Sequence, residues 1–383
     1  MSGASLQPPA GPLARAPRSS VIVRVLATVI VTACVVVARP CEGRGAGVVD
    51  GFARVVHRVT DRVWLIERPV ATDAPFEGNV EVIDQADGLV VIDAGGAPPA
   101  GRHIARLIGS VSPKPVKAIV YTHYHGDHNL GAGELLKVWP HAAVISTQRT
   151  RDNMVGKPMA YIRTYAKSYG DMVGNAERQA ALDSLPASLR AGWRRFAAAG
   201  PSMVAGYTGL SVYPATITFS DRLSFPDSIA PVEVMFLGRA NTDGDAIAWM
   251  PRQRVLATGD IVVYPIPYAS ASFLKEWIAV LNRVKEFDFA YLVPGHGEIQ
   301  TDRGYVDRLI WALTEVRSQV GPLAEKGLSL DDVRKQVRLS ELTDRFAGDD
   351  AWRRFLMGAV FLGDVVKNAY QEAKGDSIVQ GGS

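Results

Sequence analysis

The sequence predicts a mixed α/β protein, and three observations support this fold class. The chain has 383 residues, of which 47% are hydrophobic and 21% are charged, a composition typical of globular domains rather than of disordered chains. Short runs of β-branched residues between turns predict strands, and stretches of helical periodicity follow them. Histidine and aspartate residues gather directly after several of these predicted strands, which indicates a functional site.

The elements can be placed in order along the chain from these patterns. We expect strands within residues 55–56, 63–66, 80–83, 89–92, 116–121, 212–219, 232–237, 246–250, 255–258 and 291–293. We expect helices near 98–108, at 271–286 and beyond Thr301 from their helical periodicity. We also expect helices within 149–206, because Ala, Arg, Met and aromatic residues recur there at helical spacing. The predicted organisation is a main domain at 50–300 with a helical insert at 149–206, a helical extension at 301–375 and a flexible tail at 376–383.

The amino-terminal segment, residues 1–41, has the pattern of an export signal. It contains four arginines and no acidic residue, and residues 25–38 form an uninterrupted apolar or small run. Fourteen residues are fewer than the roughly 20 needed to span a bilayer, yet an uncleaved membrane anchor stays an alternative. We therefore expect a periplasmic or secreted protein, with a membrane-anchored form facing the periplasm as the alternative.

The charge of the chain argues against nucleic acid as a partner. The formal net charge is +3, but the basic excess lies in residues 1–41, beyond which 38 basic residues face 39 acidic ones. Binding to nucleic acid requires a basic surface, and no basic run is present in the sequence. The expected partner is a small-molecule substrate, with membrane contact only through an uncleaved amino-terminal segment, while the oligomeric state stays open.

A cluster of metal-binding residue types follows the predicted strand that ends near residue 121. His123, His125, Asp127 and His128 lie within six residues, and His296 stands in a Pro-Gly-His-Gly turn after a later strand. Imidazole nitrogen and carboxylate oxygen suit Zn²⁺, and a turn that leaves a strand can direct such side chains to one point. The remaining histidines, His57, His103 and His141, lie inside strand-like or helix-like patterns and are interpreted as ordinary surface or core residues.

Three further polar residues also follow predicted strands. Asp93 precedes Ala-Gly-Gly, Asp260 follows Thr-Gly, and Asn241 stands in a turn rich in Gly, Asn and Asp. None of these three residues alone indicates a functional site. Together with the histidines, they form an ordered series of polar residues that follow strands along the chain.

This ordered set resembles the metallo-β-lactamase superfamily, from about Val55 to Glu298, on the specific motif His-x-His-x-Asp-His. The resemblance implies a four-layer αβ/βα sandwich, in which two mixed sheets pack face to face, helices cover the outside and a metal site lies at one edge. It also implies roles for individual residues. His123 and His125 would bind a first zinc ion, Asp127, His128 and His296 a second, and Asp260 would bridge the two. Asp93, Thr122 and Thr242 would hold the ligands in position.

One position departs from the family pattern. The family usually supplies the third ligand of the first zinc as a histidine before threonine, and here Asn241 precedes Thr242. An amide oxygen is a weaker donor to Zn²⁺ than imidazole, so one or two zinc ions per chain are expected, with the second site the more secure. Some members of the superfamily look similar around this position, where they also have the sequence Asn-Thr-x-Gly-Asp. The alternative interpretation is that Asn241 only caps the local backbone of its turn.

The expected function is that of an exported zinc-dependent hydrolase, which uses a metal-bound hydroxide to cleave an ester, lactone, thioester or β-lactam-type small molecule. Asp127 is the expected catalytic residue, which orients the attacking group and accepts its proton. Two alternatives stay open: a non-catalytic or mono-metal binding protein with a degenerate first site, and an iron-dependent oxidoreductase of the same superfamily. Tyr161 and Tyr165 in the insert either recognise an apolar part of the substrate or only pack the insert onto the body.

Overall fold

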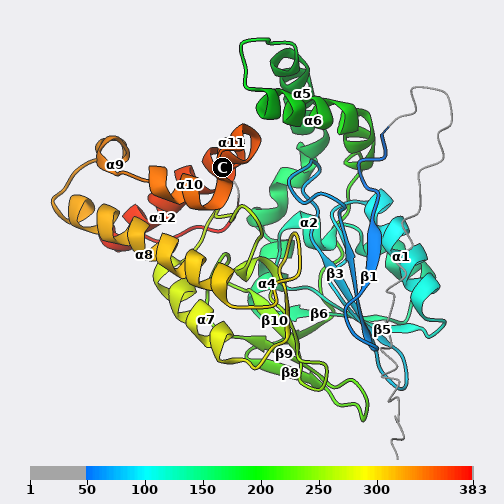
Figure 1. Ribbon diagram of the computed structural model, residues 1–383. Helices are drawn as coiled ribbons and strands as arrows, with labels where there is room; N and C mark the ends of the chain where they lie inside the picture. Colours follow the sequence, from blue (N-terminus) through cyan, green and yellow to red (C-terminus); the bar gives the residue numbers. More distant parts are fainter. Residues whose placement is uncertain (1–48, 382–383) are drawn as a thin grey trace, which may run out of the picture. The chain divides into compact units, whose positions relative to one another are not determined.

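The computed structural model describes residues 49–381, in which two β-sheets carry helices on their outer faces (Figure 1). The predicted export signal or anchor at 1–41, and the last two residues of the predicted tail at 376–383, lie outside the described residues. Within residues 49–381, no helix combines the length and the hydropathy that a membrane crossing requires.

The first sheet, within the described residues, has seven strands in sequence order. They are β1 (Val55–Arg58), β2 (Val63–Glu67), β3 (Val80–Asp84), β4 (Leu89–Ile92), β5 (Val116–Val120), β6 (Ala143–Thr147) and β7 (Ile217–Phe219). β1 to β4 pair antiparallel, whereas β4 to β7 pair parallel. The side chains of β4 are all buried, which agrees with a strand that is covered on both faces.

The second sheet of the described chain has five strands in the order β12-β11-β10-β9-β8. They are β8 (Arg222–Phe225), β9 (Val232–Phe236), β10 (Ala246–Met250), β11 (Val255–Ala257) and β12 (Tyr291–Val293). β8 to β11 pair antiparallel, and β11 pairs parallel with β12. Both sheets are therefore mixed, as expected.

Helices connect and cover the strands. They are α1 (Pro98–Val111), α2 (Gly126–Asn129), α3 (Ala132–Val138), α4 (Gln148–Val155), η1 (Lys157–Arg163), α5 (Tyr165–Ala180), α6 (Ala187–Gly206), η2 (Gly259–Ile261), α7 (Leu274–Glu286), α8 (Gly304–Glu325), α9 (Leu330–Gln336), α10 (Ser340–Ala347), α11 (Ala351–Met357), η3 (Gly358–Leu362) and α12 (Gly363–Lys374). Of these, α5 and α6 lie side by side (Figure 1).

Three hydrophobic clusters define the layers of the fold. Between the sheets, Ile83 and Val90 of the first sheet pack with Val234 of the second. On the outer face of the first sheet lie α1 and α3, and on that of the second sheet lie α7 and α8. Burial of these apolar side chains, at roughly 25 cal/mol per Å², is the main term that stabilises the arrangement. The four-layer sandwich of the metallo-β-lactamase type is thus confirmed.

Two strands were not among the predicted elements. β6 (Ala143–Thr147) runs directly into α4, so its short apolar run merges with the start of a helical pattern. β8 (Arg222–Phe225) exposes every second side chain and lies at the edge of its sheet, where the apolar signal of a strand is weakest. Pairing within each sheet, which a local pattern does not report, fixes both strands.

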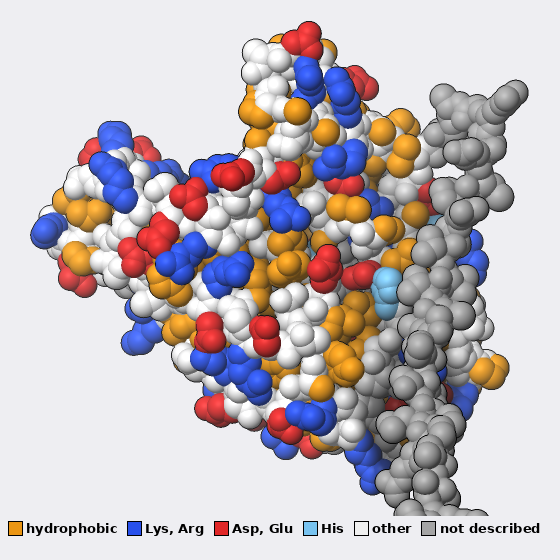
Figure 2. Space-filling view, viewed as in Figure 1, with side chains coloured by type: hydrophobic (Ala, Val, Ile, Leu, Met, Phe, Trp, Pro, Cys, Tyr) orange, Lys and Arg blue, Asp and Glu red, His pale blue; other side chains and the backbone are white. Residues whose placement is uncertain are grey.

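The surface carries charges of both signs. Over the face drawn in Figure 2, basic and acidic side chains are interspersed, and no single sign dominates the visible described surface. Exposed ion pairs of the described residues include Arg345 with Glu341. Exposed pairs typically contribute about 0–1 kcal/mol each, so the apolar layers rather than these charges determine the fold.

Candidate metal centre

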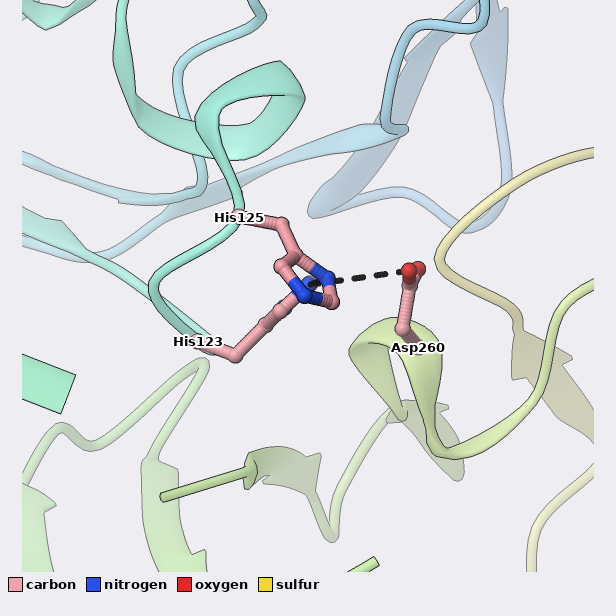
Figure 3. A group of neighbouring side chains, drawn as sticks. All are labelled: His123, His125 and Asp260. Atoms are coloured by element: carbon pink, nitrogen blue, oxygen red, sulfur yellow. Dashed lines mark hydrogen bonds and ion pairs between the residues drawn. The ribbon is translucent and has the colours of Figure 1, made fainter. Parts of the chain in front are cut away.

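The first group of converging side chains comes from β5 and β11. His123 and His125 lie in the turn after β5, and Asp260 lies in η2 directly after β11. Nε2 of His123 is 3.0 Å from Nδ1 of His125 and 3.6 Å from Oδ2 of Asp260. Figure 3 shows the two imidazoles and the carboxylate directed toward one another, and we call this group the first cluster.

The second cluster consists of Asp127 and His128 in α2 and His296 in the turn after β12. Nε2 of His128 lies 3.2 Å from Nε2 of His296, and Oδ2 of Asp127 lies 3.1 Å from Nε2 of His296. His128 and His296 are separated by 168 positions in the sequence. The carboxyl ends of β5 and β12 bring them together.

Asp260 lies between the two clusters. Its Oδ1 atom is 3.2 Å from Nε2 of His128 and 3.5 Å from Nε2 of His296, while its Oδ2 atom faces His123. One carboxylate oxygen is thus directed to each cluster. This is the placement that a bridging ligand requires.

The clusters contain buried polar atoms that a divalent cation would satisfy. Within the described residues, Oδ1 of Asp260 is buried and accepts no hydrogen bond. Pairs of imidazole nitrogens also face each other at 3.0 and 3.2 Å, although a neutral ring has only one N–H to donate. Buried polar atoms are normally paired, and a set of imidazoles and carboxylates is a donor set that divalent metals accept. The two clusters therefore fit divalent metal ions.

Asn241 lies at the first cluster. Its side chain is fully buried, and its Nδ2 atom is 3.5 Å from Oδ2 of Asp260. Its Oδ1 atom is buried and has no hydrogen-bond partner among the described residues. The Asn241 amide therefore lies beside Asp260 of the first cluster, as the sequence analysis expects, and its oxygen is available to a further partner.

A chain of hydrogen bonds orients two of the histidine rings. Oδ2 of Asp93 accepts from the Thr122 hydroxyl at 2.7 Å and lies 2.7 Å from Nδ1 of His128. Because the Thr122 hydroxyl donates to Asp93, it can accept from Nδ1 of His123, which is 3.0 Å away. Both rings then carry their proton on Nδ1 and present a bare Nε2 to the clusters, the tautomer that ligation requires.

Thr242 acts on the turn of Asn241 rather than on a ligand ring. Its backbone N–H donates to Oδ2 of Asp245 at 2.7 Å, and its hydroxyl accepts from the Gly244 N–H at 3.2 Å. Asp245 was not among the sequence candidates. Burial raises its pKa to about 7.

The electrostatics favour the metal-binding protonation state at His123 and Asp127 but not at His128. Burial, together with the neighbouring His128 and His125 rings, lowers the pKa of His123 well below its ordinary value, which leaves the ring neutral. Burial opposes ionisation of Asp127, but His128 and His296 hold its pKa below the usual range. A neutral imidazole and an ionised carboxylate are the forms that bind metals. Burial opposes charge on the His128 ring, but Asp260, Asp127 and Asp93 raise its pKa well above the ordinary value, so this ring would release a proton when a metal binds.

A cavity of about 180 Å³ opens onto both clusters. His125, Asp127, Asp260 and His296 line one side of it. The other walls are mostly aromatic and aliphatic, and include Phe76, Tyr165, Tyr169, Tyr264, Ile266, Tyr268, Leu356 and Val360. Among the residues that the structure describes, no Lys or Arg lines this cavity.

The two tyrosines singled out in the insert have different positions. Tyr165 lines the cavity, whereas the Tyr161 hydroxyl accepts a hydrogen bond from the Gly126 N–H at 3.0 Å, between the ligand candidates His125 and Asp127. The structure thus places one tyrosine at the cavity and the other on the backbone that carries the clusters.

Other residues at the cavity were not among the sequence candidates. Phe76 comes from the loop before β3, and Leu356 and Val360 come from α11 and η3, far along the chain. Ser270 places its hydroxyl 3.5 Å from Nε2 of His125. None of these residues lies in a motif, so only the tertiary structure identifies them.

The remaining histidines lie outside both clusters. His57 in β1 contacts Glu67 at 3.0 Å, and His103 in α1 contacts Asp50 at 3.0 Å. His141 lies between α3 and β6 and is exposed. No group of metal-binding side chains within the described residues includes any of the three.

Comparison with known proteins agrees with the fold and the site. Residues 73–296 match the metallo-beta-lactamase superfamily. Over 281 residues, the chain is 26% identical to a linear primary-alkylsulfatase from Pseudomonas sp. (strain ATCC 19151), an alignment that covers 67% of this chain and 49% of the relative.

Solved structures show the same fold. The stereoselective inverting sec-alkylsulfatase Pisa1 from Pseudomonas sp. superposes with a TM-score of 0.59 at 18% identity, covering 83% of this chain and 50% of that one. A double mutant of that sec-alkylsulfatase gives a TM-score of 0.55 at 17% identity, covering 85% and 55% of the two chains. This chain spans about half the length of the curated relative that it matches.

The chain belongs to the metallo-beta-lactamase superfamily, because the family match extends over more than half of its length and the fold and the clusters agree with it. Its buried His/Asp site is that of a metallohydrolase of this fold.

Proposed function

We propose that this chain hydrolyses sulfate esters of apolar alcohols at a two-zinc centre. The observation that carries the proposal is the cavity, in which His125, Asp127, Asp260 and His296 face walls that are mostly aromatic and aliphatic. Such a cavity suits a substrate with one polar, reactive end and one apolar body. The similarity to a linear primary-alkylsulfatase supports a sulfate ester over other esters.

The charge balance of the site also favours an anionic ester group. The two clusters contain four imidazoles and two carboxylates, so two divalent ions would leave an excess of positive charge. No basic side chain of the described residues lines the cavity, so the metals themselves would attract the anion. A sulfate monoester carries one negative charge and would offset part of this excess.

Zinc is the metal that we propose, on the basis of the imidazole and carboxylate donors. His123, His125 and Asp260 would hold the first ion, and Asp127, His128 and His296 the second, with Asp260 shared between them. We propose that Asn241 supplies an amide oxygen to the first ion, as in the subgroup of the family that has Asn in place of the usual third histidine. Because an amide oxygen is a weak donor, the first ion would bind less tightly than the second.

A divalent metal in such a site lowers the pKa of a bound water molecule and polarises the bond that breaks. In the overall reaction, water and the ester R–O–SO₃⁻ give the alcohol R–OH and hydrogen sulfate. Asp127 would orient the attacking water and accept its proton. Asp93 and Thr122 would keep His128 and His123 in the required tautomer, and the walls of the cavity would hold the apolar group and exclude bulk water.

The cellular context forms part of the proposal. The apolar run near the amino terminus supports export to the periplasm or the medium, with a membrane-anchored form as the alternative. A small molecule is the proposed partner.

Hydrolysis assays with metal analysis test this function. The full chain, loaded with Zn²⁺, is assayed with linear alkyl sulfates, carboxylic esters, a lactone, a thioester and a β-lactam, and its zinc and iron contents are measured. We expect about two zinc ions and release of sulfate, which a chelator stops and added zinc restores. Turnover confined to the lactone, thioester or β-lactam would overturn the sulfatase assignment, and iron in place of zinc would indicate the oxidoreductase.

A further inference from the structure

Two buried amide side chains lie at the two ends of β3. Each donates hydrogen bonds to backbone carbonyls in or next to strands of the second sheet. Asn79 precedes β3 and Gln85 follows it, and both side chains are almost fully buried. Nδ2 of Asn79 donates to the carbonyls of Pro294 and Gly297, each at 2.9 Å. Nε2 of Gln85 donates to the carbonyls of Phe225 and Ala230 at 3.1 and 2.6 Å.

The carbonyls that Asn79 binds bracket His296. They belong to the residue two positions before this histidine and to the residue directly after it, and the backbone N–H of Asn79 also donates to the carbonyl of Gly295 at 2.7 Å. Three hydrogen bonds from one residue thus hold a turn of four residues. The turn contains Gly295 and Gly297, and Gly297 has a φ of +81°. Other segments also hold it, since the Gly295 N–H donates to the carbonyls of Gly259 and Val262, each at 2.9 Å, and the Tyr264 N–H donates to the carbonyl of His296 at 3.1 Å. Of the described residues, Asn79 is the one that binds the turn on both sides of His296.

The neighbouring residue, Gly78, contacts the other half of the second cluster. Its N–H donates to the carbonyl of Asp127 at 3.2 Å. A Cβ atom at this position would lie 2.4 Å from Cε1 of His128, so only glycine permits this approach. The dipeptide Gly78-Asn79 therefore contacts both segments that form the second cluster, namely the turn of His296 and the segment of Asp127 and His128.

We propose that Asn79 is a positioning residue that fixes His296 relative to Asp127 and His128 and thereby sets the metal affinity of the second cluster. Groups that orient metal ligands without touching the metal typically change metal affinity or activity by about 10–100-fold when they are lost. Gln85 makes the same kind of bonds at the far end of the same strand, away from the clusters, and has only a structural role.

A pair of matched variants tests this inference without an assay of turnover. Asn79→Leu and Gln85→Met each remove a buried amide while adding no charge and little change in volume. Zn²⁺ is titrated by calorimetry into the metal-free full chain, and the second cluster is identified as the site that His296→Ala abolishes. Thermal unfolding of the metal-free proteins measures the structural cost of each substitution.

We expect both variants to lower Tm by similar amounts, because each leaves two buried carbonyls without a donor. Only Asn79→Leu should weaken zinc at the second cluster, by about 10–100-fold. Unchanged zinc affinity in Asn79→Leu, or an equal loss in Gln85→Met, would overturn the inference. If Asn79→Leu does not fold, Asn79→Ser, whose smaller side chain leaves room for water, is judged by the same criterion.

Discussion

Asp93 holds the ring of His128 through a contact of 2.7 Å between Oδ2 and Nδ1, and the same oxygen accepts the proton of the Thr122 hydroxyl. Asp93 has a φ of +62°, a backbone conformation that few residues other than Gly, Asn and Asp adopt readily. One strained residue at the end of β4 therefore orients a ligand candidate of the second cluster directly and His123 of the first cluster through Thr122.

Replacing Asp93 should weaken metal binding more than folding. Asp93→Asn keeps the shape and tolerates the positive φ, but it replaces a carboxyl group, both oxygens of which form hydrogen bonds, by an amide with only one acceptor oxygen. We expect zinc affinity, measured by competition with a chelator, to fall about 10–100-fold. Asp84→Asn is the matched control, because Asp84 pairs with Arg62 and Lys114 away from the clusters. Equal zinc affinities in the two variants would refute the role of Asp93.

Converting Asn241 to histidine should raise the zinc content. The side chain lies beside Asp260, and an imidazole is a better donor to zinc than the amide oxygen that it replaces. We expect Asn241→His to bind closer to two zinc ions per chain at limiting zinc, and Asn241→Ala to bind fewer than the wild type, both measured by elemental analysis. An unchanged count in Asn241→His would mean that Asn241 does not occupy the place of the missing ligand.

Two tyrosines of the insert should respond differently to substitution. Tyr165 lines the cavity, so Tyr165→Ala should change the ranking of alkyl sulfates of different length. Tyr161→Phe removes only the acceptor of the Gly126 N–H, so it should cost about 1–3 kcal/mol of stability. Chemical denaturation and a series of alkyl sulfates measure the two effects. A changed substrate ranking in Tyr161→Phe but not in Tyr165→Ala would reverse this assignment.

Glu67 should make stability depend on pH. Burial, reinforced by Glu298, raises its pKa to about 7, even though His57 lies 3.0 Å from its carboxylate. Between pH 4.5 and 7 the folded state then binds a proton that the unfolded state has lost, so this contribution to stability is complete below 4.5 and is lost as the pH rises through 7. The slope is at most about 1.4 kcal/mol per pH unit.

Glu67→Gln tests this dependence, because glutamine does not titrate. We expect the variant to gain stability relative to the wild type as the pH rises from 4.5 to 7, measured by denaturant unfolding at a series of pH values. A stability difference between the two proteins that stays constant over this window would show that Glu67 is ionised throughout.

The candidate residues of the clusters could be named from the sequence because each stands directly after a strand. Imidazoles and carboxylates at a strand exit are visible in a local pattern, and His123, His125 and His296 lie where the strands meet. The strands themselves were mostly predictable from their β-branched runs. β6 and β8 were not, because sheet pairing rather than local pattern defines them.

The surroundings of the clusters could not be predicted in the same way. Asn79 acts on a turn more than 200 positions away, and Val360 reaches the cavity only because the carboxy-terminal helices fold back onto it. Neither residue carries a local pattern that distinguishes it from an ordinary loop or helix residue. Contacts of this kind depend on the packed tertiary structure.

The most direct test of the central claim is the position of bound zinc in crystals of the full chain, measured by anomalous scattering at the zinc edge. We expect one peak among His123, His125 and Asp260 and a stronger peak among Asp127, His128 and His296, the two separated by the Asp260 carboxylate. Crystals with ample zinc that show no peak at either group, or zinc only elsewhere on the molecule, would contradict the account.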